Sequence, residues 1–482
     1  METLESHPAS ARDRGVTVAF LALLLAALSF ALLQTMVAPA LPDLQRELST
    51  TTTGVSWVLS AFLLTASVAT PVIGRLGDMF GKHHLLLVSL SVFTAGTLMA
   101  ALSHSIGLLV VARAIQGVGA GTFPLAFGII RDVFPHERVA TAIGLISATF
   151  GIGAGVGLVV SGVIVDHLGW QSIFWLGFAL CLAATVAAWA FVPESPVRSP
   201  GRVDWAGAAL LSGGLVALLL AISQGRVWGW GSPRVVGLLA LAVALLVTLV
   251  LVERRVEQPL IDVRLLRRRA VLTPDVAALI FGFGMFGAFT LLPLFVETPS
   301  RVGYGFSASV TGAGVFLLPS AAGMLVSGPL AGWIGSRAGF KPVLFVASLF
   351  GAAAFGVFAV AHAERWPIYL GSALLGIGVG LAFASLINLV VEAVDQRQTG
   401  EATGVNTIMR TIGGSLGAQV AATIVASHEA PGTAVPAESG FTIAFAVSAG
   451  AMVLAAAAAL ALPRRPARET QAADLAPEPS RA

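Results

Sequence analysis

Long apolar stretches joined by short polar connections are the feature that most limits what this chain can fold into. A transmembrane α-helix needs about 20 consecutive, mostly apolar residues, and fourteen stretches meet that requirement. They cover residues 15–41, 54–77, 84–103, 106–129, 141–165, 172–192, 206–223, 234–253, 271–296, 308–331, 342–361, 367–391, 403–427 and 441–462. With only 11% charged residues, the chain has too few polar side chains to cover a soluble surface. The sequence therefore predicts an all-α integral membrane protein with fourteen transmembrane helices.

Residues 71–84, PVIGRLGDMFGKHH, contain a spacing of proline and glycine that occurs again later in the chain. We expect this segment to be a tight loop joining two helices, because it lies between two long apolar stretches. The matched pairs are Pro71 with Pro329, Gly74 with Gly332, Gly77 with Gly335, and Gly81 with Gly339. Glycine patterns near Gly117 and Gly151 also return near Gly376 and Gly413. Internal repeats of this kind indicate a doubled unit.

The repeats predict two pseudo-symmetric six-helix bundles of the same orientation, at residues 1–198 and 270–463. An inserted helix pair, residues 199–269, separates them. Within it, residues 259–269, PLIDVRLLRRR, alternate apolar and basic side chains. We expect this stretch to lie as an amphipathic segment on the inner membrane surface, with a solvated linker as the alternative. Residues 464–482 are polar and are expected to form a disordered cytoplasmic tail.

Lysine and arginine are concentrated in every second connection between the predicted helices, together with both ends of the chain. The positive-inside rule assigns such connections to the cytoplasm. We therefore expect a multi-pass plasma-membrane protein with both termini in the cytoplasm. Arginine is far more frequent than lysine, which is typical of a GC-rich bacterial genome. The expected location is therefore the bacterial inner membrane.

Two arginines lie within the predicted spans, where a charge normally faces the bundle interior or a watery cavity. Gln116 follows Arg113 by three residues and Asn406 precedes Arg410 by four, so each amide shares a helical face with its arginine. We expect a polar cavity between the two halves. The alternative is that helix carbonyls and neighbouring amides hold each arginine inside the protein. The candidate cavity residues are Gln34, Thr35, Arg113, Gln116, Asn388, Asn406 and Arg410.

Acidic residues are missing from the middle of every predicted span. The nearest are Asp275 and Glu297, at opposite ends of the stretch 271–296, and they are candidate edge acids for proton coupling. Small residues that let helices pack closely are expected at Gly117, Gly121, Gly153, Gly157, Gly413 and Gly417. One cysteine, Cys181, and no cluster of His, Cys, Asp and Glu predict no metal, no cofactor and no enzyme active site. The net charge of +3 is no signature of nucleic-acid binding.

Residues 74–82, GRLGDMFGK, resemble the cytoplasmic loop signature of the major facilitator superfamily, and within it the fourteen-helix drug:proton antiporters. Residues 109–121, with Arg113, Gln116 and Gly117, are similar to the fourth-helix motif of that family. The resemblance covers nearly the whole chain. It implies the major facilitator fold, in which two halves rock around a central site and expose it alternately to each side.

The resemblance implies a cytoplasmic gate loop formed by Gly74, Gly77, Asp78, Gly81 and Lys82. In such carriers the carboxylate of Asp78 pairs with a basic residue and faces the positive N-terminus of a helix from the other half. Contacts of this kind break when the inner side opens. The alternative is that Asp78 only caps the turn.

Three departures from the family pattern leave the coupling ion open. Met79 replaces an arginine after Asp78, Leu33 stands where the first helix commonly has an acid, and the fifth helix lacks its usual proline. The expected function is therefore a secondary-active exporter of amphipathic small molecules or drugs, with and without proton antiport as two alternatives. Without a central acid, Arg113 and Arg410 favour anionic or neutral cargo. A membrane sensor or enzyme is a weaker alternative, and a monomer is expected.

Overall fold

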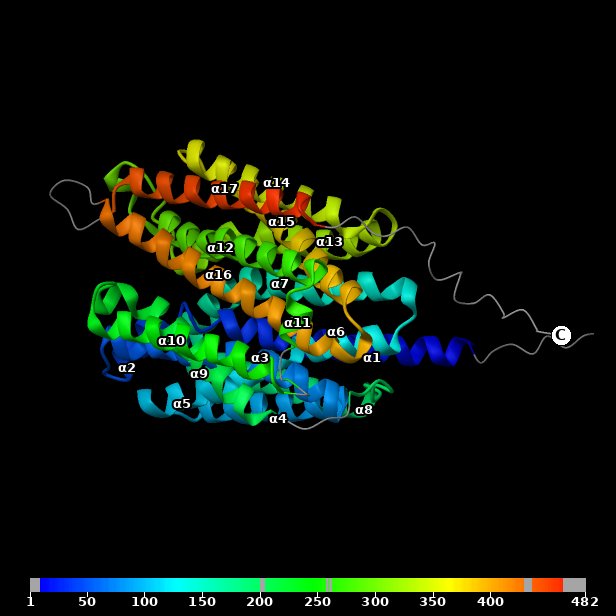
Figure 1. The fold of residues 1–482 in the computed structure, drawn as a ribbon. Coiled ribbons are helices and arrows are strands. Elements are labelled where there is room, and N and C mark those ends of the chain that lie inside the picture. The colour runs from blue at the N-terminus through cyan, green and yellow to red at the C-terminus, as the bar shows by residue number, and fades with distance from the viewer. Residues whose placement is uncertain (1–8, 200–203, 257–258, 260–261, 429–435, 463–482) are drawn as a thin grey trace, which may run out of the picture.

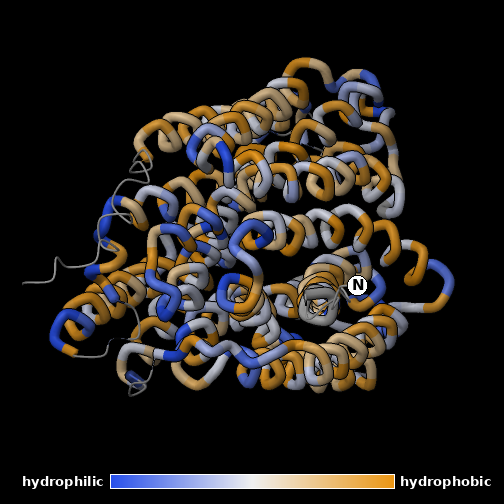
Figure 2. The backbone as a smooth tube through the Cα atoms, turned by 90° about the vertical axis from the view of Figure 1, so that its right-hand side faces the viewer, coloured by the Kyte–Doolittle hydropathy of each residue, from blue (hydrophilic) through white to orange (hydrophobic). Residues whose placement is uncertain are grey.

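The computed structural model describes the chain except residues 1–8, 200–203, 257–258, 260–261, 429–435 and 463–482, so the predicted tail lies outside the described residues. The described part is almost entirely helical. Fourteen of its helical segments are long and apolar enough to cross a membrane, which confirms the predicted number. In Figure 1, α1 begins and α17 ends on the same side of the molecule. Seen from that side in Figure 2, hydrophilic residues gather in the connections and the helices are mostly hydrophobic.

Each span overlaps its predicted apolar stretch, with ends that differ by up to about six residues. The spans of the first half are α1 (Ala9–Thr35), α3 (Thr52–Phe80), α4 (Lys82–Ala101), α5 (Ile106–Gly117) continued by η1 (Val118–Gly121) and α6 (Thr122–Val133), α7 (His136–Leu168) and α8 (Gln171–Phe191). The inserted pair is α9 (Trp205–Trp228) and α10 (Pro233–Glu253). The second half has α12 (Arg269–Glu297), α13 (Val310–Ala338), α14 (Phe340–Val360), α15 (Arg365–Ala393), α16 (Thr399–Ser427) and α17 (Glu438–Leu460). Short helices are α2 (Leu41–Glu47), α11 (Val263–Leu266), η2 (Ser300–Val302) and η3 (Gln396–Gln398).

Residues 71–84 are not a loop, and that prediction is wrong. Helix α3 continues to Phe80, and α4 begins at Lys82. Gly81 alone separates them, with φ at 113°, a conformation that glycine adopts without a Cβ clash. Gly339, with φ at 83°, separates α13 from α14 in the same way. The repeated motif is therefore the last turns of a helix followed by a glycine break.

Two hydrophobic cores correspond to the two halves of the chain, and the largest contacts between them are made by two pairs of helices. One core is built mainly from α1 to α8 and the other from α12 to α17. Helix α7 packs on α13, and α3 packs on α16. A Cβ on Gly144 would overlap the carbonyl of Gly328, and a Cβ on Gly74 would overlap that of Gly400. The halves therefore meet backbone to backbone in both pairs.

The inserted helix α9 touches both halves. Ala208, Leu211 and Leu215 pack with Val405 and Ile408 of α16, and residues of α3 join the same cluster. Helix α10 packs on α9 and is mostly exposed at its surface. Within the stretch 259–269, which is predicted to be amphipathic, Leu265 of α11 is buried with residues of α15 and α16, whereas Arg264 is exposed.

Candidate functional site

Arg113 lies inside the first half and not between the halves. Its Nε donates to the Val58 carbonyl at 3.1 Å, and its Nη1 donates to Gln116 Oε1 at 2.8 Å and to the Leu33 carbonyl at 3.4 Å. The guanidinium lies 4.1 Å from the centre of the Phe62 ring, and the side chain is fully buried. Among the described residues its Nη2 has no hydrogen-bond partner. This geometry matches the alternative in which carbonyls and an amide hold the arginine.

We expect the main effect of Arg113→Ala to be a lower free energy of unfolding. The change leaves the Val58 carbonyl and the Gln116 amide without their charged donor, and hydrogen bonds to charged groups contribute about 1.5–3 kcal/mol each. The predicted loss is about 3 kcal/mol in the free energy of unfolding. Thermal unfolding of the purified protein in detergent measures it. An unchanged midpoint together with lost transport would instead assign Arg113 to the cargo pathway.

Arg410 lies where the two halves meet. Its guanidinium is 4.0 Å from the centre of the Phe383 ring on α15 and 5.3 Å from that of Phe150 on α7. The two rings belong to different halves and meet edge to face, with centres 5.6 Å apart. The residue is only 5% exposed, and no hydrogen bond from its guanidinium is found within the described chain. We call Phe150, Phe383 and Arg410 the seam site.

A row of aromatic rings connects the seam site with Arg113. Phe150 stacks on Phe123 with centres 4.3 Å apart, and Phe123 meets Phe30 at 5.7 Å. Phe30 in turn stacks on Phe62 at 5.4 Å, and Phe62 carries the Arg113 guanidinium. Aromatic rings offer large apolar faces with a negative quadrupole that attracts cations. The protein thus has an apolar, aromatic interior with a cation at each end.

The other predicted cavity residues are divided between packing and interhelix contacts. Thr35 Oγ1 donates to the Gly153 carbonyl at 2.5 Å, which ties α1 to α7. Asn388 Nδ2 donates to the Ala384 carbonyl at 2.7 Å and reaches the Ala140 carbonyl of the other half at 3.5 Å. Gln34 is half-buried. Gln116 donates to Thr97, within the first half.

The predicted packing glycines are close to neighbouring helices. A Cβ on any of them would lie within 3 Å of an atom of another helix or segment. The partners are α3 for Gly117 and Gly121, α1 for Gly153 and Gly157, and α12 for Gly413 and Gly417. These glycines therefore set the spacing of the helices that carry the polar residues.

Asp275 lies near the start of α12 and is buried. It is 3% exposed, on the face of α12 that packs against α16, and its Oδ1 accepts the Nδ2 of Asn406 at 2.9 Å. The carboxylate thus packs against the face of α16 that also carries Arg410. The expectation of a polar interior without an acid is therefore wrong. Glu297, at the other end of α12, is half-buried.

Two residues of the predicted gate loop, Gly74 and Asp78, meet the other half at the end of the bundle where Arg131 and Arg397 lie, which we call the basic end. Asp78 Oδ2 accepts the backbone N–H of Glu401, in the first turn of α16, at 3.1 Å. Lys82 Nζ lies 3.3 Å from Asp78 Oδ1 and 2.8 Å from Asp132 Oδ2. Asp78 and Lys82 are fully buried. The carboxylate thus faces the positive N-terminus of a helix from the other half.

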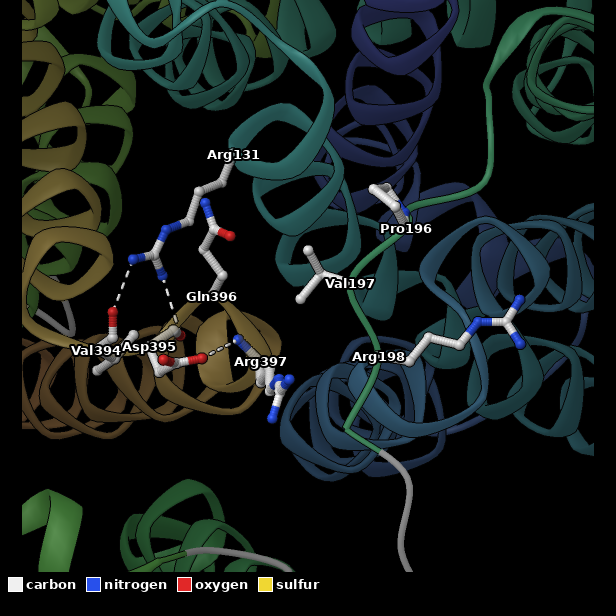
Figure 3. A pocket seen from close by; sticks show the side chains of 8 residues that line it. All are labelled: Arg131, Pro196, Val197, Arg198, Val394, Asp395, Gln396 and Arg397. Carbon is white, nitrogen blue, oxygen red and sulfur yellow. Dashed lines mark hydrogen bonds between the residues drawn. The ribbon is translucent and has the colours of Figure 1, made fainter.

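Two further contacts at the basic end were missed from the sequence. Arg131, at the end of α6, donates to the Val394 carbonyl at 2.7 Å and to Thr399 Oγ1 at 2.6 Å, both in the second half. Figure 3 shows its side chain reaching across to the Val394–Asp395 turn, beside a pocket of about 740 Å³. Arg75 on α3 lies 3.6 Å from the carboxylate of Glu401 on α16. The basic end is therefore closed by contacts between the halves.

Glu401 also joins the inserted segment to this end. Its Oε1 accepts the backbone N–H of Asp262, just before α11, at 2.7 Å. The side chain of Glu401 is almost fully buried. The two halves and the segment after α10 thus meet at one carboxylate. The sequence offered no motif for this contact, because the residues are far apart in the chain.

Known proteins with similar sequences include transporters and drug-resistance proteins. A Streptomyces glaucescens protein described as the tetracenomycin C resistance and export protein is 30% identical over 389 residues, 80% of this chain and 71% of that protein. Multidrug resistance protein 3 of Bacillus subtilis is 26% identical over 407 residues, 83% of this chain and 78% of that protein. An uncharacterized MFS-type transporter of Mycobacterium tuberculosis is 31% identical over 392 residues; the match covers 80% of this chain but only 56% of that protein.

Among solved structures, the human organic anion transporter MFSD10 (TETRAN) has the same fold, with a TM-score of 0.67 and 19% sequence identity. The match covers 94% of this chain and 100% of that one. The family model of the Major Facilitator Superfamily matches residues 23–418, most of the chain. The chain therefore belongs to the Major Facilitator Superfamily.

Proposed function

We propose that the chain exports amphipathic small molecules with aromatic rings across the bacterial inner membrane. The observation that carries this proposal is the seam site, where Arg410 lies between Phe150 and Phe383 of different halves. Relatives named for multidrug resistance and for tetracenomycin C export support the same direction of transport. A flat apolar cargo would take the place of the contact between the two rings. An anionic or neutral cargo suits the charge of Arg410.

In an alternating-access cycle, the contacts at the basic end would keep that end closed. Asp78, Arg75 and Arg131 join the halves there, so the structure corresponds to a transporter closed on that side. The basic end faces the cytoplasm in this proposal, because positive charge favours that side. Export then requires these contacts to break, so that cargo enters the seam site from the cytoplasm. They form again when the opposite end opens.

Proton antiport is the proposed source of energy, and a facilitator without coupling is the alternative. Purified protein in vesicles, oriented with the basic end outward, should concentrate a fluorescent aromatic anion in an acid lumen. With the membrane potential held at zero, an exchange of one proton per cargo supports about tenfold accumulation per pH unit. A facilitator would bring the cargo only to equal concentrations, whatever the gradient. Vesicles without protein correct for passive movement of the dye.

The remaining features of the proposal concern location and assembly. We place both termini in the cytoplasm and the fourteen spans in the plasma membrane, with a monomer as the transporting unit. Each half supplies one ring of the seam site, so a single chain contains the complete site. Cross-linking of the protein in native membranes, followed by size analysis, tests the monomer; a dominant dimer would contradict it.

A further inference from the structure

Asp275 is a buried carboxylate without a cation. It lies near the start of α12 and is 3% exposed. The charged residues of α11, α16 and the first turn of α12 are engaged elsewhere or exposed: Glu401 faces Arg75, Arg410 stacks on Phe383, and Arg264 and Arg269 are exposed at the basic end. Among the described residues, no basic side chain forms a salt bridge with Asp275. A lone ionised carboxylate is costly in such a place, and a neutral one is not.

Its partner Asn406 is also incompletely bonded. The amide Nδ2 donates to Asp275 Oδ1 at 2.9 Å and approaches the Pro274 carbonyl at 3.4 Å. The amide Oδ1 is buried and has no donor within the described chain. An ionised carboxylate only accepts hydrogen bonds, whereas a protonated one has an O–H to donate. A single proton on Asp275 would therefore remove a buried charge and supply a donor beside the unpaired oxygen.

We propose that Asp275 holds a proton in this closed-basic-end conformation and releases it to the cytoplasm when that end opens. Its place near the start of α12 brings it close to the surface that opening would wet. The O–H bond of the carboxylic acid then breaks, the proton passes to water, and the carboxylate keeps the hydrogen bond from Asn406 Nδ2. Asn406 acts as a positioning residue, because it holds the carboxyl group in place.

The same helix face connects this proton site with the seam site. Asn406 and Arg410 are four residues apart on α16, so they lie one turn apart on one side of that helix. Gly282 packs on the carbonyl of Arg410, and Gly413 packs on that of Leu279, so α12 and α16 touch without side chains between them. A change of charge at Asp275 therefore acts on the helix that carries Arg410. This coupling rests on the exporter function proposed above.

Infrared spectroscopy of the full-length protein in lipid nanodiscs tests the proton site without any cargo. Protonated carboxyl groups have a distinct carbonyl stretch, which disappears as pH rises through their titration. We expect Asp275→Asn to remove one such band, Asn406→Leu to displace its titration, and Glu297→Gln to leave it in place. Asp275→Glu should restore a band at a changed frequency. A spectrum that Asp275→Asn leaves unchanged would overturn the proposal.

Transport then tests the coupling separately. In vesicles with an acid lumen, Asp275→Asn should lose at least tenfold accumulation of cargo while downhill movement of the same cargo continues. Equal accumulation by wild type and Asp275→Asn would overturn the coupling role even if the band belongs to Asp275. If wild type accumulates no cargo, the exporter proposal fails, and the infrared band still decides whether Asp275 holds the proton.

Discussion

Replacing Asp78 with asparagine is expected to move the transporter towards a state open at the basic end, by roughly ten- to hundredfold in population. The Asp78 carboxylate accepts the Glu401 N–H at 3.1 Å and lies 3.3 Å from Lys82 Nζ. Asparagine keeps the shape of the side chain but removes the charge that strengthens both contacts. Lys82 keeps its pairing with Asp132 at 2.8 Å, so the variant leaves no buried cation unpaired.

The distance between the basic ends of the two halves measures this shift. The single cysteine, Cys181, is buried, so a Cys181→Ser background permits spin labels at Glu137→Cys and Gln396→Cys. Double electron–electron resonance spectroscopy measures the distance between the two labels. It should show a larger fraction of the longer distance in Asp78→Asn than in the parent. The control is Asp43→Asn, an acid paired with Arg46 beyond the outer end of α1. Equal distance distributions for the Asp78 variant and its parent would show that Asp78 does not help to keep the basic end closed.

Arg410→Ala is expected to raise the KM for an aromatic anion about thirtyfold. A cargo ring that enters between Phe150 and Phe383 would lie against the Arg410 guanidinium, which is 4.0 Å from the Phe383 ring, and a desolvated guanidinium on an aromatic ring contributes about 2 kcal/mol or more. The same change also removes the positive charge that faces an anionic cargo. For a neutral aromatic cargo of similar size we expect a smaller loss, because only the stacking and the shape of the site change.

The second half supplies a matched control for this experiment. Arg337 stacks on Trp333 at 4.1 Å but is exposed, near the end of α13. Arg337→Ala removes the same group from a similar ring contact and should leave the KM unchanged. Initial rates in vesicles at several cargo concentrations provide the comparison. A KM that falls for anions in Arg410→Ala would show that the arginine repels the cargo instead of binding it.

Hydropathy predicts the helices of this protein well because the bilayer sets their apolar length. Hydropathy predicts the ends of the helices less well, because helices continue beyond the apolar stretch into polar residues. Helix α16 begins at Thr399, several residues before its apolar stretch, and that first turn holds Glu401. Helix α3 likewise continues through Asp78 to Phe80. The gate contacts therefore lie in helical turns that the apolar pattern leaves out.

The polar residues were found from the sequence, but most of their partners on other helices were not. Arg113 and Arg410 both appear as charges inside a span, yet one is held by carbonyls of its own half and the other lies on rings from both halves. Which residues each arginine contacts depends on how segments that are distant in the chain pack together. Arg131 lies at the end of a span, where arginine is common, so nothing in the sequence marks its contact with Val394.

Helix α9 covers the line along which α3 and α16 meet. Ala208, Leu211 and Leu215 fill that line from the lipid side, and Gln419 of α16 reaches the Ser223 carbonyl farther along α9 at 3.5 Å. An amphipathic molecule dissolved in the membrane would meet a wall of aliphatic side chains there. The extra helix pair thus blocks access from the bilayer to the interior between α3 and α16. Cargo that arrives through the bilayer must take a different entrance.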